Sequence, residues 1–136
     1  MRRLVENRAD GRCEYCLPRQ EDSYFPHHID HIISRKHGGR SVFTNLAYTC
    51  VRCNVAKGTD VGSINPQDGA LIAFFNPRRQ RWASHFMLRG AVIEPLTAEG
   101  AATARVLQFN LDKRVWTIPQ IRSPGRVPYS GSFVRR

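Results

Sequence analysis

The sequence lacks any long hydrophobic run, and this excludes several classes of protein. Among its 136 residues no stretch approaches the roughly 20 consecutive apolar residues needed to cross a bilayer. The first eight residues contain no apolar segment of the kind that directs secretion. We therefore expect a cytoplasmic protein whose hydrophobic residues, 41% of the chain, fill a modest core of their own.

Acidic residues are also scarce. The chain has 11 Asp and Glu against 21 Lys and Arg, which gives a formal net charge of +10 at pH 7. Such an excess favours a polyanionic partner, because each phosphate that a protein neutralises releases a bound counterion. A basic surface that only keeps the protein soluble would show the same balance. Charge therefore makes nucleic acid a candidate partner without establishing it.

Cysteine is present only four times, as two C-x2-C pairs with 33 residues between them: Cys13 and Cys16, then Cys50 and Cys53. Reduced cysteines in a cytoplasmic protein more often bind metal than form disulfides. Two such turns suit a tetrahedral ion bound by four sulfurs. A disulfide framework, a redox C-x2-C motif and an iron–sulfur cluster are the alternatives. We predict a structural Zn²⁺ that has no open coordination position for chemistry.

A run of three histidines and one aspartate lies between the cysteine pairs, at positions 27 to 31. Phosphodiester hydrolysis needs a base that takes a proton from water and a cation that takes up negative charge. An imidazole is suited to the first task near neutral pH, and carboxylate and amide oxygens are the ligands that Mg²⁺ prefers. We interpret His31 as the base, and Asp30 and Asn54 as ligands of Mg²⁺ or another divalent cation such as Mn²⁺.

The run has the apolar flanks of a β-strand. An ideal strand directs Asp30 and His31 to opposite faces, so the strand must twist or end there if both serve one site. His28 shares the face of Asp30 and is a further candidate ligand of the divalent ion. For His27 we expect a packed, half-buried side chain.

Hydrophobic patterning predicts an α+β fold in one domain over residues 1–136, with a core over 1–59. We expect Leu4 and Val5 to point inward from the first helix and Gly58 to end the last helix of the core. The expected elements of the core are a helix over 2–9, a strand over 24–33, a basic glycine-containing loop over 34–40, a strand over 45–49 and a helix over 50–57.

A helix-strand-helix layer is expected after a connector at 60–69. Its basic first helix covers 77–88, its strand 91–96, and its second helix runs from Ala98 to Phe109 with Thr97 as N-cap. The layer extends over 70–122, and the Pro-, Gly- and Ser-rich segment 123–136 is expected to be a flexible basic tail.

Taken together, these motifs resemble the HNH endonuclease family. The matching elements are Cys13-x2-Cys16, His28-Ile29-Asp30-His31-Ile32-Ile33, Gly38-Gly39, Asn45-Leu46 and Cys50-x2-Cys53-Asn54-x2-Lys57-Gly58. The resemblance implies a zinc-stapled ββα-metal core that hydrolyses DNA with one divalent cation. It implies His31 as general base, Asn45 as the residue that orients it, and Asn54 as a metal ligand at a position where other members have His. Ser34 stands where many members have Pro.

The resemblance also implies the form of the reaction. One active site would nick DNA and leave 5′-phosphate and 3′-hydroxyl ends. Cutting both strands would need a dimer, or two separate binding events by a monomer. Five basic residues are candidates for phosphate contacts: Arg35, Lys36, Arg40, Arg52 and Lys57. The alternatives are a non-catalytic zinc-ribbon module that binds DNA or RNA, and an RNA-directed HNH nuclease. A zinc ribbon has no need of Asp30, His31, Asn45 and Asn54.

Overall fold

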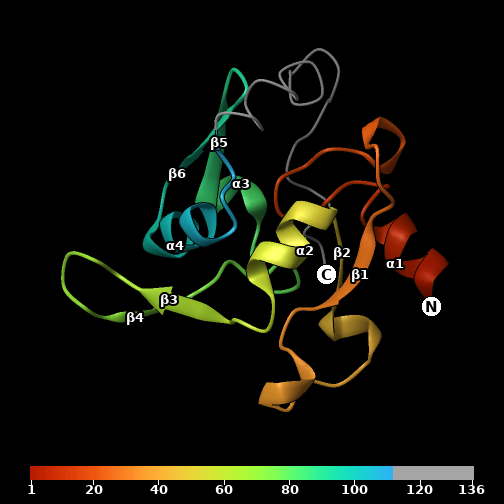
Figure 1. Ribbon diagram of the computed structural model, residues 1–136, viewed down its shortest axis with the longest axis horizontal. Helices are drawn as coiled ribbons and strands as arrows, with labels where there is room; N and C mark the ends of the chain where they lie inside the picture. The colour runs from red at the N-terminus through yellow and green to blue at the C-terminus, as the bar shows by residue number, and fades with distance from the viewer. Residues whose placement is uncertain (112–136) are drawn as a thin grey trace.

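The structure is a computed structural model and describes residues 1–111 (Figure 1). It confirms the α+β prediction. In chain order the helices and strands are α1 (Arg2–Arg8), β1 (His28–His31), β2 (Leu46–Thr49), α2 (Val51–Lys57), β3 (Gly62–Ile64), β4 (Leu71–Ala73), α3 (Trp82–His85), β5 (Phe86–Arg89), β6 (Val92–Pro95) and α4 (Ala98–Val106). Within this part of the chain, no helix combines the length and the apolar character that a membrane span requires.

The β1–β2 hairpin and α2 form the strand-loop-strand-helix unit that the sequence predicts. The two strands are antiparallel and pair His28 with Thr49 and His31 with Leu46. The expected strand over 24–33 is too long, because Tyr24 is 94% exposed and only four residues of that segment pair with β2. The second strand and the helix each begin one residue later than expected. Gly58, with φ of +53°, caps α2 as predicted.

The first helix packs on β2 through one side only. Val5 is fully buried and forms a small cluster with Ala9, Leu46 and Tyr48. The prediction that Leu4 also points inward is wrong, since its side chain is 58% exposed. Successive residues of a helix are turned by about 100° from one another, and the side of α1 that faces β2 is the one that carries Val5.

The C-terminal layer contains more strand than the sequence suggests. The expected connector at 60–69 includes β3, which pairs with β4. The expected helix over 77–88 is wrong in extent: α3 covers four residues, and Phe86–Arg89 pairs with β6 across a turn at Gly90, where φ is +63°. The order helix, strand, helix is therefore present as α3, β6 and α4, with β5 added.

The last helix has the N-cap that the sequence predicts. Thr97 Oγ1 accepts a hydrogen bond from Gly100 N at 3.0 Å. The helix ends at Val106 rather than Phe109, because the chain turns at Gln108, where φ is +57°. Figure 1 shows α2 between the β1–β2 hairpin and α4, while the β3–β4 hairpin extends to one side. The expected tail and the end of the layer lie outside the described residues.

Buried contacts join the C-terminal layer to the first cysteine turn. Trp82 Nε1 donates a hydrogen bond to Tyr15 O at 2.8 Å, and Arg78 forms a buried ion pair with Glu14. The rings of Phe75 and Tyr15 meet edge to face, with their centroids 6.3 Å apart. Glu14 and Tyr15, the two residues between Cys13 and Cys16, are therefore both held by side chains of the C-terminal layer.

Candidate functional site

The four cysteines meet at the junction of the first turn and α2. Their Sγ atoms all lie within 4.8 Å of one another, and the sulfurs of Cys16 and Cys50 are 3.5 Å apart. Four sulfurs at Zn–S distances of about 2.3 Å in a tetrahedron are separated by about 3.8 Å. The two pairs are built alike, because Cys16 N donates to Cys13 Sγ and Cys53 N donates to Cys50 Sγ, each at 3.4 Å.

Burial affects the charge state of these thiols. Burial raises the pKa of the Cys13 and Cys53 thiols well above the usual range. A bound dication favours the thiolate form and so opposes this effect of burial. The cysteines are therefore grouped so that they could hold one zinc ion.

The imidazole of His31 lies at the end of β1 and is half-buried. Its Nε2 atom is 2.7 Å from Ser41 Oγ, in the loop that joins β1 to β2. Its Nδ1 atom has no hydrogen-bond partner among residues 1–111. One ring nitrogen is thus held by the protein, and the other is available to a water molecule or a substrate.

The side chain of Asn45 holds the β1–β2 loop closed. Its Oδ1 accepts a hydrogen bond from Ile33 N at 3.0 Å, and its Nδ2 donates to Ile33 O and to Arg40 O, each at 2.9 Å. None of these bonds is to the ring of His31, the residue that Asn45 is expected to orient. Asn45 instead fixes the backbone on both sides of the loop, including the residue before Ser41.

Glycine is required where this loop folds back on β1. A Cβ atom at Gly39 would lie 1.7 Å from Ile33 O and 2.9 Å from the Asn45 amide nitrogen. Gly39 N donates to Ser34 O at 2.9 Å, which closes the turn on its other side. Any side chain at this position would push the loop away from Asn45.

Asp30 precedes His31 on β1, and its side chain makes a buried ion pair. Its Oδ2 atom is 3.0 Å from Lys57 Nζ, and the two side chains are 10% and 2% exposed. Lys57 Nζ also donates to His31 O at 2.9 Å. Burial raises the pKa of the Asp30 carboxyl, and the Lys57 ammonium opposes that shift. The prediction that Lys57 contacts phosphate is wrong, because its ammonium faces Asp30 and has almost no solvent-accessible surface.

The other two candidate ligands of a divalent ion lie nearby. Asn54 is half-buried and sits one turn before Lys57 on α2, so both lie on the side of the helix that faces β1. His28 is exposed, at the first position of β1 and two residues from Asp30. No hydrogen bond links either side chain to Asp30 within the described residues. Asp30 Oδ2 accepts no well-aligned hydrogen bond, and the cation beside this buried oxygen is the Lys57 ammonium.

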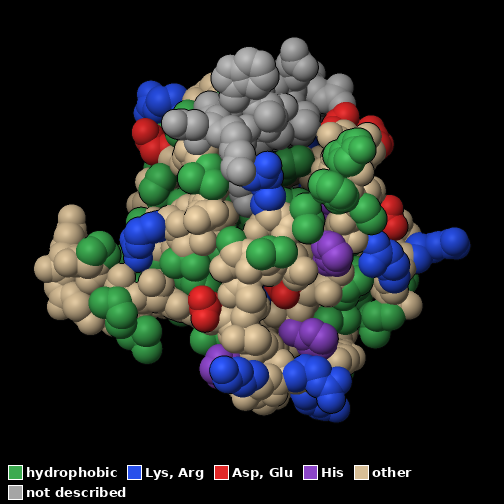
Figure 2. All heavy atoms as spheres, viewed as in Figure 1, with side chains coloured by type: hydrophobic (Ala, Val, Ile, Leu, Met, Phe, Trp, Pro, Cys, Tyr) green, Lys and Arg blue, Asp and Glu red, His purple; other side chains and the backbone are tan. Residues whose placement is uncertain are grey.

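The basic residues of the loop and of the outer side of α2 are exposed. These are Arg35, Lys36, Arg40 and Arg52. None of them has an acidic partner within residues 1–111, where the ion pairs use other cations. Figure 2 shows histidine, lysine and arginine side chains together at the lower part of the face on which α2 lies, where Figure 1 shows the β1–β2 loop.

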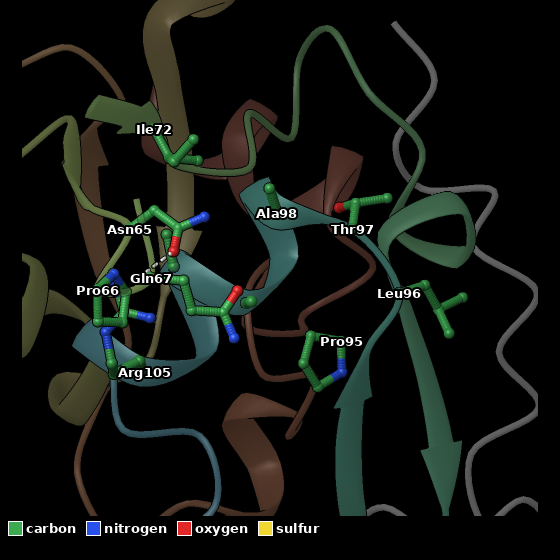
Figure 3. Close-up of a pocket in the computed structure, with 11 residues that line it drawn as sticks. Asn65, Pro66, Gln67, Ile72, Pro95, Leu96, Thr97, Ala98 and Arg105 are labelled. Atoms are coloured by element: carbon green, nitrogen blue, oxygen red, sulfur yellow. Dashed lines mark hydrogen bonds between the residues drawn. The ribbon is translucent and has the colours of Figure 1, made fainter. Parts of the chain in front are cut away.

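A hollow in the surface lies away from these residues. It has a volume of about 430 Å³ and lies between the β3–β4 hairpin loop and the start of α4 (Figure 3). Its only ionisable lining residue is Arg105, whose guanidinium donates to Ile64 O at 3.0 Å. The hollow has no group suited to acid–base or metal chemistry, so the candidate site is the β1–α2 region.

Sequence reasoning missed two features of this site. The burial of Lys57 has a signal in the sequence, since it follows the inward-facing Cys53 by four residues on the same helix. The contact of Ser41 with His31 has none, because ten residues and a folded loop separate them.

Comparison with known proteins identifies the segment that carries these residues. Residues 13–60 match the model of the HNH endonuclease family, so the predicted resemblance is confirmed over that segment. The match indicates a nuclease, with nucleic acid as its substrate. No curated protein and no solved structure matches the chain.

Proposed function

We propose that the chain is a metal-dependent endonuclease that hydrolyses DNA phosphodiester bonds. The observation that carries this proposal is the pairing of a half-buried imidazole, open at Nδ1, with a buried carboxylate at the preceding position of β1. Both lie within the segment that matches the HNH family. His31 is the general base, and removal of a proton from water by its Nδ1 supplies the nucleophile.

Asp30 and Asn54 are the proposed ligands of a divalent cation, Mg²⁺ or Mn²⁺, with His28 as a further candidate. When bound, the ion supplies a Lewis acid that takes up charge on the scissile phosphate and the departing oxygen. Lys57 holds the Asp30 carboxylate in place through the 3.0 Å ion pair. The ion pair also keeps Asp30 charged against the effect of burial.

The cysteine cluster is proposed to hold a structural Zn²⁺. Two of its thiols come from the turn after α1 and two from the start of α2, so the ion fixes α2 against the N-terminal part of the domain. This sets where Asn54 and Lys57 lie relative to β1. The zinc has four thiolate ligands and takes no direct part in the reaction.

DNA is proposed to lie against the exposed basic residues of the loop and α2, which contact its phosphates. A single site of this kind cuts one strand, so a monomer nicks DNA. Cleavage of both strands requires a dimer, or a second binding event by the monomer at the opposite strand. The products are 5′-phosphate and 3′-hydroxyl ends.

A cleavage assay with a matched histidine control tests the proposal. Supercoiled plasmid and structured RNA are incubated with Mg²⁺, Mn²⁺ or EDTA. We expect nicking of the plasmid with either metal and none with EDTA. His31→Ala should lower the rate by roughly 10²–10⁴-fold and leave DNA affinity and zinc content unchanged. The control His37→Ala removes an exposed imidazole six residues further along and should cut as the wild type does.

Three further variants separate the roles within the site. Asp30→Ala and Asn54→Ala should weaken binding of the divalent ion and leave the zinc in place. Asn45→Ala should lower the rate with both metals retained, because it opens the loop rather than removing a ligand. If His31→Ala cuts as fast as the wild type, the assignment of His31 as the base is wrong. If the wild type itself cuts neither plasmid nor RNA, the protein is a non-catalytic zinc-dependent binding module. Preferential cleavage of the RNA would make it an RNA-directed nuclease of the same family.

A further inference from the structure

The loop between β1 and β2 brings the hydroxyl of Ser41 within hydrogen-bond distance of His31, the proposed base. Ser41 Oγ lies 2.7 Å from His31 Nε2, within the usual range for a strong hydrogen bond. His31 is half-buried, while Ser41 and the hydrogen bond itself are exposed. The ring makes this one side-chain hydrogen bond within residues 1–111, and the orientation of the imidazole therefore depends on it.

The identity of the proton in this bond decides whether His31 can act as a base. In a neutral imidazole one nitrogen carries the proton and the other has a lone pair. If Nε2–H donates to Ser41 Oγ, the lone pair is on Nδ1, the nitrogen without a protein partner. If Ser41 donates to Nε2 instead, Nδ1 carries the proton and cannot accept one from water. Only the first arrangement fits catalysis.

Resting on the proposed function, we propose that Ser41 is a positioning residue that accepts a hydrogen bond from His31 Nε2–H and so holds Nδ1 unprotonated toward the attacking water. A serine hydroxyl can accept this bond and still donate its own proton to solvent, because Ser41 is exposed. The partner of the second imidazole nitrogen commonly sets the tautomer in this way.

The same geometry explains how Asn45 acts on His31 without touching its ring. Asn45 Nδ2 binds Arg40 O, which is the carbonyl immediately before Ser41. Asn45 Oδ1 binds Ile33 N, two residues after His31. The amide therefore fixes the distance between the strand that carries the imidazole and the loop that carries the hydroxyl, and Ser41 transmits that constraint to the ring.

Three variants of the full chain test this role. Ser41→Ala should lower kcat by about 10–100-fold, the loss usual for residues that orient a catalytic group, with KM close to that of the wild type. Ser41→Thr keeps the hydroxyl and should recover most of the rate. Thr44→Ala, which removes an exposed hydroxyl from the same loop, should behave as the wild type. If Ser41→Ala raises KM and leaves kcat unchanged, Ser41 contacts DNA and the proposal is overturned.

Nitrogen NMR of the imidazoles separates this inference from the nuclease activity. Protonated and unprotonated ring nitrogens have well-separated ¹⁵N shifts, and the spectrum needs no substrate or added divalent ion. At about pH 8, above the range where imidazoles ordinarily gain a proton, the wild type should show His31 protonated at Nε2 only. Ser41→Ala should show a mixture of tautomers, and Ser41→Thr should not. A His31 signal that Ser41→Ala leaves unchanged overturns the proposal. A wild type with the expected tautomer and no cleavage overturns the proposed function alone.

Discussion

At the scale of single residues, burial disfavours the charged form of His27. His27 is 1% exposed, and its Nε2 donates to Pro18 O at 3.0 Å. Its Nδ1 is buried without a hydrogen-bond partner among the described residues. A proton added there would create a buried charge with no acceptor, and burial accordingly lowers the pKa of His27.

The lowered pKa of His27 predicts that the stability of the folded protein depends on pH. The pKa of His27 is lower in the folded than in the unfolded chain, so the unfolded chain binds more protons once the pH falls below about 6.5. The free energy of unfolding should therefore drop as the pH falls below that value, by at most about 1.4 kcal/mol per pH unit from this residue. Urea unfolding at several pH values measures this decrease in the wild type and in His27→Gln. The free energy of unfolding of His27→Gln should decrease less as the pH falls.

The matched control is His37→Gln. His37 is exposed in the β1–β2 loop, so its replacement should leave the wild-type pH dependence unchanged. Equal slopes for the wild type and His27→Gln would show that His27 gains its proton in the folded state without cost.

At the scale of elements, α2 is short and is held by contacts on one face. It has seven residues, too few for stable helix formation in isolation. Cys53 and Lys57 are its buried side chains, and the cysteines at its start bring it to the first turn. The zinc proposed there therefore determines whether α2 and the β1–β2 hairpin remain together.

Removal of zinc should unfold this unit. Structural zinc sites contribute on the order of 10 kcal/mol at neutral pH, which exceeds the stability of many small domains. We expect about one zinc per chain by elemental analysis, loss of the circular dichroism signal with a chelator, and its recovery when Zn²⁺ is added. Cys50→Ser should fail to fold stably. Folded wild-type protein with less than about half an equivalent of zinc would contradict this expectation.

At the scale of the whole molecule, the cysteine turn and the C-terminal layer depend on each other. The Glu14 carboxylate is fully buried, and it pairs with Arg78, whose side chain is 6% exposed. Burial raises the pKa of Glu14, and the Arg78 guanidinium opposes that effect. The layer therefore supplies the charge that allows an acidic residue to lie inside the C-x2-C turn.

Loss of this ion pair should destabilise the entire domain. Arg78→Met leaves an uncompensated buried carboxylate and should cost about 3–5 kcal/mol, measured by urea unfolding. The neighbouring Arg79→Met is the control, because Arg79 is exposed and has no ion-pair partner among residues 1–111. Adding Glu14→Gln to Arg78→Met should recover part of the loss. Equal stability of the two single variants would show that the pair has no net structural role.

The exposed basic residues act together on binding. Arg35, Lys36, Arg40 and Arg52 have no acidic partners in the described part of the chain, so phosphates can replace their counterions. Replacing any one by Gln should lower DNA affinity and reduce the slope of log K against log salt by about 1. Arg89→Gln is the control, since Arg89 already pairs with Glu94 at 3.0 Å. A slope that none of the four changes would place the DNA elsewhere.

The sequence by itself determined the features that depend on short spacing. Each C-x2-C pair brings two sulfurs together, and Thr97 caps the helix that begins at the next residue. The strand β2, the helix α2 and its glycine cap were also predicted to within a residue. The two C-x2-C turns and the two helix caps join groups a few residues apart, so the local pattern contains the whole of each. The identity of the candidate base and carboxylate likewise came from one run of five residues.

Only the tertiary structure decided the features that depend on distant partners. Phe86–Arg89 is a strand because β6 pairs with it, although its residues also suit a helix. Lys57 is basic and would suit a phosphate contact, but folding places it against Asp30, 27 positions away in the chain and 3.0 Å away in space. Ser41 reaches His31 because Asn45 and Gly39 fold the loop onto β1. These outcomes are set by which groups the fold brings together, and residue type at a single position does not contain that information.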